Sequence, residues 1–389
     1  MIKNINESIV YVGTDDHDID LFEGMYDVPD GVSYNSYVIL DEKITVMDTV
    51  DERKTDEWLK NVKEALNGKN PSYLVVQHME PDHSASIEAF LNVYPETEVV
   101  GNVKTFKMIS QFFPKLEIKN KKTVADGESL EIGSHILNFV FAPMVHWPEV
   151  MLTYESSEKI LFSADAFGKF GALDVEDEWD CEARRYYFGI VGKYGKMVQN
   201  LLKKAAALEI NTICPLHGPV LTENLGHYID LYDKWSKYEA ENNGICVCYA
   251  SVYGNTKKAA ELLCNKLEEY GAPAVICIDL ARCDMSEAVE DAFRYDSLVL
   301  ASITYNGDVF PRMKTFISNL TERSYQNRRI GYIENGSWAP TAARVMREAF
   351  KNSVNMTEVE NNITITSALN DAAVEKIDAL AKELVAKYN

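Results

Sequence analysis

The sequence is poor in basic residues and lacks a long apolar run. Its 389 residues include 39 lysines and arginines against 60 aspartates and glutamates, which gives a formal net charge of −21 and a pI near 4.8. A surface of that sign repels phosphate backbones, so we expect no binding to nucleic acid. No apolar run approaches the roughly 18–20 residues that cross a bilayer. Because residues 1–7 also lack the apolar core of a signal peptide, we expect a cytoplasmic protein with no membrane contact.

Cysteines are few, and none of the seven forms a Cys-x-x-Cys pair. That excludes the paired-thiolate modules that hold zinc or iron, and the odd count fits a reducing compartment. Cys246 and Cys248 lie two residues apart in an apolar run, and we interpret them as buried structural thiols. The sequence also contains neither the Gly-x-Gly-x-x-Gly turn of dinucleotide-binding domains nor a Walker phosphate loop.

The chain divides into two parts that differ in their pattern of expected strands and helices. This difference predicts two domains, 1–243 and 244–389. The first part is rich in short strands separated by turn signals. The second alternates strands and helices, which predicts a doubly wound parallel five-stranded sheet. We place the boundary after a helix over about 225–241, with Asn242-Asn243-Gly244 as helix stop and linker. Strands of the second domain are expected at 245–250, 274–279, 297–302, 329–333 and 362–366, and its clearest helices at 256–270 and 370–387.

Side chains that commonly bind metals appear at or just after the expected strands of the first domain. Four of them form an H-x-E-x-D-H cluster over residues 78–83, and four ionisable groups in six residues are costly to bring together without a cation. A lone His or Asp beside a strand is more often a cap or a paired polar group, and we interpret His17, His135 and His227 in that way. The candidate ligands are His78, Glu80, Asp82, His83, His146, Asp165 and His217.

Four imidazoles and three carboxylates are too many ligands for one tetrahedral zinc ion. They suit two ions, with Asp165 as the natural bridge. Mixed imidazole and carboxylate ligands favour iron that binds a small gas, although ligand type alone leaves zinc open.

A second candidate site lies in the second domain. Ser251-Val252-Tyr253-Gly254-Asn255-Thr256 follows an expected strand and opens a helix, where hydroxyls and backbone N–H groups suit a single phosphate. Two further loops, Thr304-Tyr305-Asn306-Gly307 and Asn335-Gly336-Ser337-Trp338, meet it at the carboxyl edge of the sheet. Their aromatic side chains could flank a flat ring. The alternatives are an ordinary capped turn and loop aromatics that serve a subunit contact.

These motifs resemble those of a known family. The cluster at 78–83 resembles the metallo-β-lactamase motif, with Glu80 where that motif has its second His, and this replacement is the mark of the flavodiiron proteins. His146-Trp147-Pro148, Asp165-Ala166-Phe167-Gly168 and Pro215-Leu216-His217-Gly218 match the family's later ligands. The second half is similar to flavodoxin, which binds FMN, although Ala339-Pro340 after Trp338 departs from the commonest flavodiiron pattern. The resemblance implies an N-terminal metallo-β-lactamase-like αββα sandwich followed by a C-terminal flavodoxin-like α/β domain.

The resemblance also implies ligand roles and an activity. One iron would bind His78, Glu80 and His146, and the other Asp82, His83 and His217, with Asp165 bridging and no catalytic residue beyond the ligands. The implied enzyme is an oxidoreductase that reduces O2 to water, NO to N2O, or both. Its electrons pass through FMN from rubredoxin or a related reductase. The choice of gas and of donor stays open, and candidates for a gas pocket are Phe22, Tyr26 and Trp147.

Two other functions stay open at this point: a zinc hydrolase of the metallo-β-lactamase superfamily with an appended flavodoxin module, and a pure electron carrier. The resemblance also implies a head-to-tail homodimer, or a tetramer built from two such dimers. Nothing in the sequence suggests that a linker of a few residues folds one site of a chain onto the other, and two-fold closure is the commonest soluble assembly.

Overall fold

The computed structural model describes residues 2–388. The chain folds as two compact units, one of Met1–Tyr187 with Lys196–Asp233 and one of Phe188–Gly195 with Lys234–Asn389. The domain boundary after residue 243 stays a prediction; residues 234–243 belong to the second compact unit. Within residues 2–388, no helix has the length and apolar content that a membrane span requires.

The first unit contains two large sheets. The strands of the first, in the order β1-β2-β7-β8-β9-β10-β11, are Lys3–Asn4, Ile9–Tyr11, Tyr37–Ile39, Thr45–Met47, Tyr73–Val75, Glu98–Gly101 and Lys121–Thr123. The second has the order β12-β13-β14-β15-β16, with strands Ser129–Glu131, Ile136–Phe141, Met151–Glu155, Ile160–Phe162 and Thr212–Cys214. Two small hairpin-like pairs accompany them: β3 (Thr14–Asp16) with β6 (Val32–Tyr34), and β4 (Leu21–Phe22) with β5 (Tyr26–Asp27).

One hydrophobic core joins the two sheets. Alternate residues of the strands face it, for example Tyr37 and Ile39 from β7 and Leu137 and Phe139 from β13, as the two-residue side-chain period of a strand requires. Burying each such side chain contributes roughly 1.5–3 kcal/mol, so the strands are fixed more by this core than by their short ladders.

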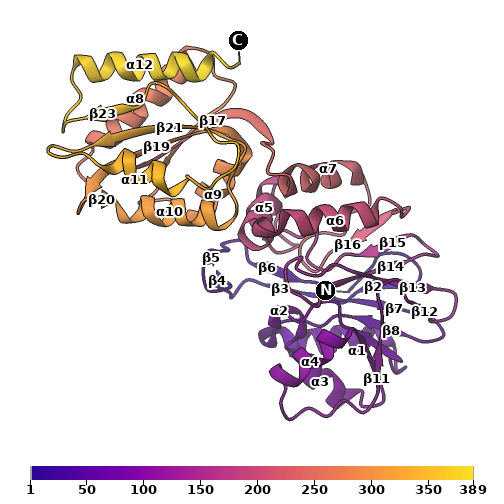
Figure 1. The fold of residues 1–389 in the computed structure, drawn as a ribbon. Helices are drawn as coiled ribbons and strands as arrows, with labels where there is room; N and C mark the ends of the chain where they lie inside the picture. Colours follow the sequence, from indigo (N-terminus) through magenta and orange to yellow (C-terminus); the bar gives the residue numbers. More distant parts are fainter. Residues whose placement is uncertain (1, 389) are drawn as a thin grey trace. The chain divides into compact units, whose positions relative to one another are not determined.

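Helices cover the outer faces of the two sheets (Figure 1). In Figure 1, α1, α3 and α4 lie outside one sheet and α6 and α7 outside the other, which confirms the predicted αββα layering. The helices are α1 (Thr55–Leu66), α2 (Pro81–Ser84), α3 (Ile87–Val93), α4 (Val103–Phe112), α5 (Trp179–Tyr186), α6 (Gly195–Ala205) and α7 (Leu225–Ser236).

The second unit has a parallel sheet in the order β18-β17-β19-β21-β22, and β23 also pairs with β21. Helices α8 and α12 pack on one face, and α9, α10 and α11 cover the other (Figure 1). The predicted doubly wound sheet is therefore confirmed. Its strands are β17 (Asn242–Ala250), β18 (Val275–Asp279), β19 (Tyr295–Tyr305), β20 (Asp308–Val309), β21 (Arg329–Asn335), β22 (Thr357–Glu358) and β23 (Ile363–Ile365). Its helices are α8 (Asn255–Glu269), α9 (Met285–Arg294), α10 (Pro311–Glu322), α11 (Ala342–Ala349) and α12 (Asp371–Val385).

The predicted helix stop at 242–244 is wrong. Helix α7 ends at Ser236, and Asn242 already pairs with Tyr295 as the first residue of β17, with a shift of register before Ile245. Gly244 lies so close to Tyr295 that a Cβ atom on it would be 2.6 Å from the ring. The glycine therefore serves a close approach between two strands, a long-range contact that its local sequence does not reveal.

Candidate functional site

The H-x-E-x-D-H cluster follows the end of β9 and enters α2. The buried carboxylate of Asp48 accepts hydrogen bonds from the backbone N–H of Gln77 (2.7 Å) and from its side-chain amide (2.8 Å), and so fixes the turn before His78. Pro81 occupies the first turn of α2, where its missing N–H costs nothing. Asp82 and His83 stand on that turn and are buried.

Asp165 and His217 follow β15 and β16, which are parallel neighbours. Ala164 and Phe167 have φ angles of 51° and 66° on either side of Asp165. Such left-handed backbone is uncommon for residues other than glycine and is often found at functional sites. The carbonyl of Ser33 lies 2.7 Å from Nδ1 of His217, so this nitrogen carries the proton and Nε2 is left to face the cluster.

The seven candidate ligands come together as two groups, His78 with Glu80, His146 and Asp165, and Asp82 with His83 and His217. In the first group, Oε2 of Glu80 lies 3.2 Å from Nε2 of His78 and 3.0 Å from Nε2 of His146. In the second, Oδ2 of Asp82 lies 3.3 Å from Nε2 of His83 and 3.1 Å from Nε2 of His217.

Asp165 stands between the two groups. Its Oδ2 faces the first group, 3.2 Å from His78 and 3.3 Å from His146. Its Oδ1 faces the second, 3.2 Å from Nε2 of His83. One carboxylate therefore presents one oxygen to each group, which is the geometry that a bridging ligand needs.

The donor set fits divalent cations. Within residues 2–388, neither oxygen of Asp165 and neither oxygen of Asp82 has a hydrogen-bond partner of acceptable geometry, although all four atoms are buried. A buried carboxylate without partners is costly, whereas an ion between the carboxylates and the imidazoles would satisfy both. Imidazole and carboxylate ligands in two groups of three or four suit two ions of the iron or zinc kind.

The charges of the cluster are strongly coupled. Burial alone would raise the pKa of Asp165, but the facing ring of His78 holds it well below its usual range. Burial would lower the pKa of His146, yet the facing carboxylates of Asp165 and Glu80 raise it to about 9. The carboxylates thus demand positive charge at this place, which protons on the imidazoles or divalent ions can supply.

Glu149 is a partner of the cluster that sequence reasoning missed. It is buried, and its Oε1 accepts from the Met79 N–H at 2.9 Å and lies 2.9 Å from Nδ1 of His78. Because Nδ1 faces a carboxylate, it carries the proton, and Nε2 of His78 is free toward the other ligands. A single glutamate about 70 residues away in the sequence gives no local signal of this role.

Glu23 was also missed. It follows β4, and its carboxyl group forms a hydrogen bond with Glu80; burial, the charge of Glu80 and this hydrogen bond raise its pKa to about 8. Of the candidates for a gas pocket, Phe22 has its ring centroid 5.5 Å from His217, and Trp147 has its own 5.4 Å from His78. Tyr26 instead packs 5.6 Å from Phe170.

The three other histidines each contact a carboxylate away from the cluster. His17 lies 2.9 Å from Asp174, His135 2.6 Å from Asp41, and His227 2.7 Å from Asp180. These pairs agree with the interpretation of the three histidines as structural or surface residues.

The three predicted flavin loops of the second unit line one cavity of about 700 Å³. That volume is in the range of small-molecule sites. The cavity lies at the carboxyl ends of β17, β19 and β21, as the doubly wound topology predicts. Ala339, Thr341 and Ser367 line it as well and were not predicted.

The first loop has the features of a phosphate site. Gly254, at φ 89°, precedes α8, and its N–H donates to Oγ of Ser251 at 3.1 Å. Thr256, in the first turn of α8, is fully buried, and within residues 2–388 its hydroxyl has no hydrogen-bond partner. Helix α8 has 15 residues, and its positive N-terminal end favours an anion beside that hydroxyl.

The second and third loops are held rigidly by their own polar groups. Thr304 and Tyr305 belong to β19, and Asn306-Gly307 is the two-residue turn of a hairpin with β20. The hydroxyl of Thr304 accepts from the N–H of Thr341 at 2.9 Å. The side chain of Asn335 both donates to and accepts from the backbone of Ser367. Ser337 contacts the hydroxyl of Ser367 at 2.6 Å.

The loop aromatics stay exposed. The exposed fraction is 95% for Tyr253 and 83% for Trp338. Tyr305 is less exposed and its ring packs edge-on against Phe310. Because the rings of Tyr253 and Trp338 are mostly exposed, they are available to a flat ligand or to a subunit contact.

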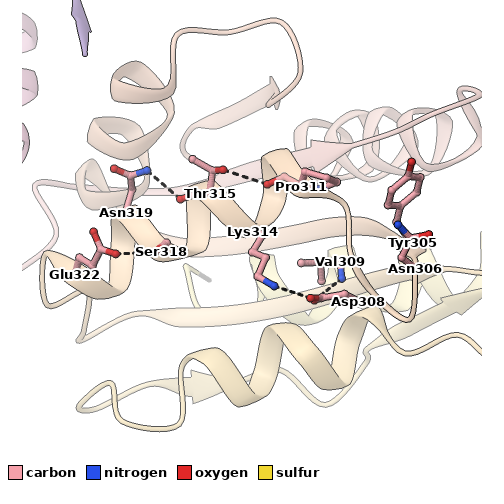
Figure 2. A pocket seen from close by; sticks show the side chains of 10 residues that line it. All are labelled: Tyr305, Asn306, Asp308, Val309, Pro311, Lys314, Thr315, Ser318, Asn319 and Glu322. Atoms are coloured by element: carbon pink, nitrogen blue, oxygen red, sulfur yellow. Dashed lines mark hydrogen bonds and ion pairs between the residues drawn. The ribbon is translucent and has the colours of Figure 1, made fainter. Parts of the chain in front are cut away.

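A neighbouring hollow along α10 is a poorer candidate. Figure 2 shows its side chains, with Tyr305 and Asn306 at one end. Its polar groups pair with one another: Lys314 with Asp308 at 2.6 Å and Ser318 with Glu322 at 2.7 Å. The cavity with the unpartnered Thr256 hydroxyl is therefore the one that fits a flavin phosphate.

Comparison with known proteins agrees with both units. Residues 32–218 match the ODP family beta lactamase, and residues 246–368 match a flavodoxin domain. The chain is 27% identical over 358 residues to a nitric oxide reductase of Moorella thermoacetica, covering 89% of each protein.

Two solved structures share the fold. Rubredoxin oxygen:oxidoreductase from Desulfovibrio gigas has a TM-score of 0.92 at 22% identity, with 100% of this chain and 98% of that chain covered. The flavodiiron protein from Giardia intestinalis has a TM-score of 0.90 at 23% identity, with 99% and 97% covered.

Proposed function

This chain is a member of the flavodiiron proteins, and from that premise we propose that it reduces O2 to water, NO to N2O, or both, with electrons relayed through FMN. The observation that carries the proposal is Asp165, whose two oxygens face two complete ligand groups. A relative that covers nearly the whole chain is named a nitric oxide reductase, which supports a gas as the substrate.

FMN and two iron ions are the cofactors of this proposal. His78, Glu80 and His146 would hold one ion and Asp82, His83 and His217 the other, with Asp165 shared between them. When bound, the two irons would supply the redox chemistry at the gas and the flavin would supply one-electron transfer. The chain's own part is to fix the ligands: Glu149 and the Ser33 carbonyl orient the rings of His78 and His217. Phe22 and Trp147 place apolar rings beside them.

The flavin would lie in the cavity between the three loops of the second unit. The buried Thr256 hydroxyl and the N-terminus of α8 would bind its phosphate, with Ser251 shaping the turn. The exposed rings of Trp338 and Tyr305 would cover the flat ring system. Electrons would come from an external donor such as rubredoxin or a related reductase, as the name of the Desulfovibrio gigas enzyme suggests.

Parallel turnover with O2 and with NO tests the substrate. Purified chain is loaded with iron and FMN and supplied anaerobically with the same chemically reduced rubredoxin in both assays. We expect consumption of at least one gas well above that of rubredoxin alone. Reduction of neither gas by protein with full iron and flavin content would refute the proposal.

Metal identity is tested separately. After iron-replete expression we expect close to two irons per chain, as the two ligand groups require. His78→Ala and His146→Ala should lose metal and gas reduction while FMN stays bound, because the flavin cavity belongs to the other unit. Full gas reduction by protein that contains only zinc would contradict the iron assignment.

The zinc hydrolase is the weaker candidate. Glu80 stands where the hydrolase motif has a histidine, and the flavin cavity has no purpose in hydrolysis. The hydrolase function would be supported if the zinc-loaded chain hydrolysed an ester, thioester or lactam and His78→Ala abolished that activity.

For the assembly we propose a head-to-tail homodimer in which the flavin of one subunit serves the metal centre of its partner. The proposal is supported by the family and by two exposed loop aromatics at the flavin cavity, Tyr253 and Trp338. It is tested by co-expressing two inactive variants. One has Ser251 and Trp338 changed so that it loses FMN, and the other is His78→Ala. Purified heterodimers should regain part of the activity, since one of their two cross-subunit sites is intact. No recovery in confirmed heterodimers, or full activity of a monomer, would overturn the dimer proposal.

A further inference from the structure

Two cysteines of the second unit face each other between α8 and the edge strand β18. Cys277 is the strand partner of Val247, so the two side chains point to the same face of the sheet. Val247 belongs to the hydrophobic core that includes Cys264 of α8. Helix α8 packs on β18 along this face. A helix residue and a strand residue 13 positions apart in the sequence are thereby brought together.

The two thiols are in contact and differ in exposure. A side-chain hydrogen bond joins the thiol of Cys264 to the sulfur of Cys277. Cys264 is 6% exposed, whereas Cys277 is an exposed residue. Helix residues Lys257 and Glu261 lie two turns and one turn before Cys264 on the same side, and they pair at 3.6 Å. Cys277 is thus the solvent-accessible residue of the pair, and the fold shields most of Cys264.

The pair has the electronic asymmetry of a reactive dithiol. The hydrogen bond from Cys264 is the main influence that lowers the pKa of Cys277, burial and Glu261 oppose it, and Lys257 adds to the lowering. The same hydrogen bond and burial raise the pKa of Cys264. Because the thiolate is the reactive form, the accessible cysteine is the one disposed to react first.

We propose that Cys277 and Cys264 are a peroxide-reactive pair that forms a reversible disulfide. The oxidant is a hydroperoxide such as hydrogen peroxide. The sulfur of Cys277 attacks its O–O bond and becomes a sulfenic acid, and one water leaves. The thiol of Cys264 then attacks that sulfur, the S–O bond breaks, and a second water leaves. Two thiols and one hydrogen peroxide thus give one disulfide and two waters, and an external dithiol restores the thiols.

The other close pair of the unit is a contrasting case. Sγ of Cys246 and Sγ of Cys248 are 3.5 Å apart, but both residues are fully buried and stand two positions apart on one strand. An oxidant in solvent does not reach them, so proximity of sulfurs alone does not define a reactive site. The Cys264–Cys277 pair combines contact with access, and it is independent of the proposed gas reduction.

The test treats the FMN- and iron-loaded chain with one equivalent of hydrogen peroxide. Matched variants are Cys264→Ser, Cys277→Ser and, as a control with a partly exposed thiol, Cys283→Ser. Free thiols are counted after denaturation, and linked peptides are identified by mass spectrometry. We expect two of the seven thiols per chain to be lost and recovered with dithiothreitol, with a peptide linked through Cys264 and Cys277. Cys283→Ser should behave like the unchanged chain.

The single variants separate the two steps. Cys264→Ser should stop at a sulfenic acid on Cys277 that dimedone traps, and Cys277→Ser should leave Cys264 reduced because it is shielded. Retained FMN absorbance shows that each variant is folded. Seven unreacted thiols in the unchanged chain, an equal loss in Cys277→Ser, linkage between chains, or oxidation that dithiothreitol does not reverse would each overturn the proposal.

Discussion

The two candidate sites are built in opposite ways. The metal cluster consists of side chains that the fold has closed off: His78, His83 and His217 are fully buried. The flavin cavity consists of loops whose backbone is fixed while its aromatic side chains are free, with Tyr253 95% and Trp338 83% exposed. One site is therefore preorganised at the level of side chains, and the other only at the level of backbone.

The difference follows from what each ligand requires. Small ions need several charged groups at fixed distances, and bringing carboxylates and imidazoles together without solvent demands support from groups such as Glu149 and Asp48. A flat organic cofactor brings its own large surface, so loops with a phosphate site and unoccupied rings suffice. We expect substitutions at the metal cluster to act nearly all-or-none and those at the flavin loops to act by degrees.

The largest effect is expected for Asp165→Ala. Because one oxygen faces each ligand group, the change should weaken both metal positions at once. We expect gas reduction to fall by more than roughly 100-fold, beyond the 10–100-fold typical of groups that only support a ligand. Iron per chain and turnover are measured beside His146→Ala, which removes a ligand of one group only. Near-normal turnover of Asp165→Ala would show that the carboxylate is not shared.

A smaller loss is expected for Glu149→Gln. Gln keeps the shape and an acceptor for the Met79 N–H, but it removes the charge that faces Nδ1 of His78. Metal affinity should fall by about 10–100-fold while FMN content is unchanged. Competition with a chelator measures the affinity, and Glu88→Gln, on the exposed side of α3, is the control. Equal metal affinities in Glu149→Gln and Glu88→Gln would show that the charge of Glu149 does not support metal binding.

The sequence indicated the candidate ligands better than the residues that support them. Residues 78–83 carry four candidate ligands in six positions, and a short apolar run before each later candidate indicates a strand end, so the seven side chains that the fold brings together could be found locally. Glu149 and Asp48 could not be found in this way, because each acts through a hydrogen bond across about 30 or 70 residues of sequence. In the second unit, loop positions followed from the strand and helix alternation, but Ser367 entered the cavity through a distant strand end.

The fold shows the same division. All five expected strands of the second domain were found, and the two central ones, β17 and β19, are apolar runs that the parallel sheet buries on both faces. The helix stop at 242–244 failed because pairing of Asn242 with Tyr295 outweighed the local preference of Asn and Gly for turns. Local patterns thus predict element type, and long-range pairing decides where elements end.

For the flavin site, Thr256→Val should have two moderate and opposite effects. It should raise the stability of the flavin-free chain and lower its affinity for FMN. The hydroxyl is buried without a partner among residues 2–388, so an isosteric methyl should stabilise the flavin-free chain by about 1 kcal/mol. Loss of a hydrogen bond to a phosphate should weaken FMN binding by about 1.5 kcal/mol, roughly tenfold. Thermal unfolding of the flavin-free protein and flavin titration measure the two effects. Thr256→Ser, which keeps the hydroxyl, is the control and should bind FMN like the unchanged chain. If Thr256→Val also bound FMN with unaltered affinity, the phosphate would not contact Thr256.

The smallest effect is expected for Trp338→Ala. A side chain that is 83% exposed contributes little to folding, so the free energy of unfolding of the flavin-free chain should change by no more than about 0.5 kcal/mol. Its ring would still matter once a flat ligand lies against it, because stacking contributes about 0.5–1.5 kcal/mol, roughly a two- to tenfold change in FMN affinity. Flavin titration measures that change, and Val354→Ala, exposed on the same unit but outside the cavity lining, is the control. Metal content should be unaltered. A large loss of stability in Trp338→Ala would mean that the side chain of Trp338 holds the loop. The contrast between a site fixed by side chains and one fixed by backbone would then fail at one of its most exposed residues.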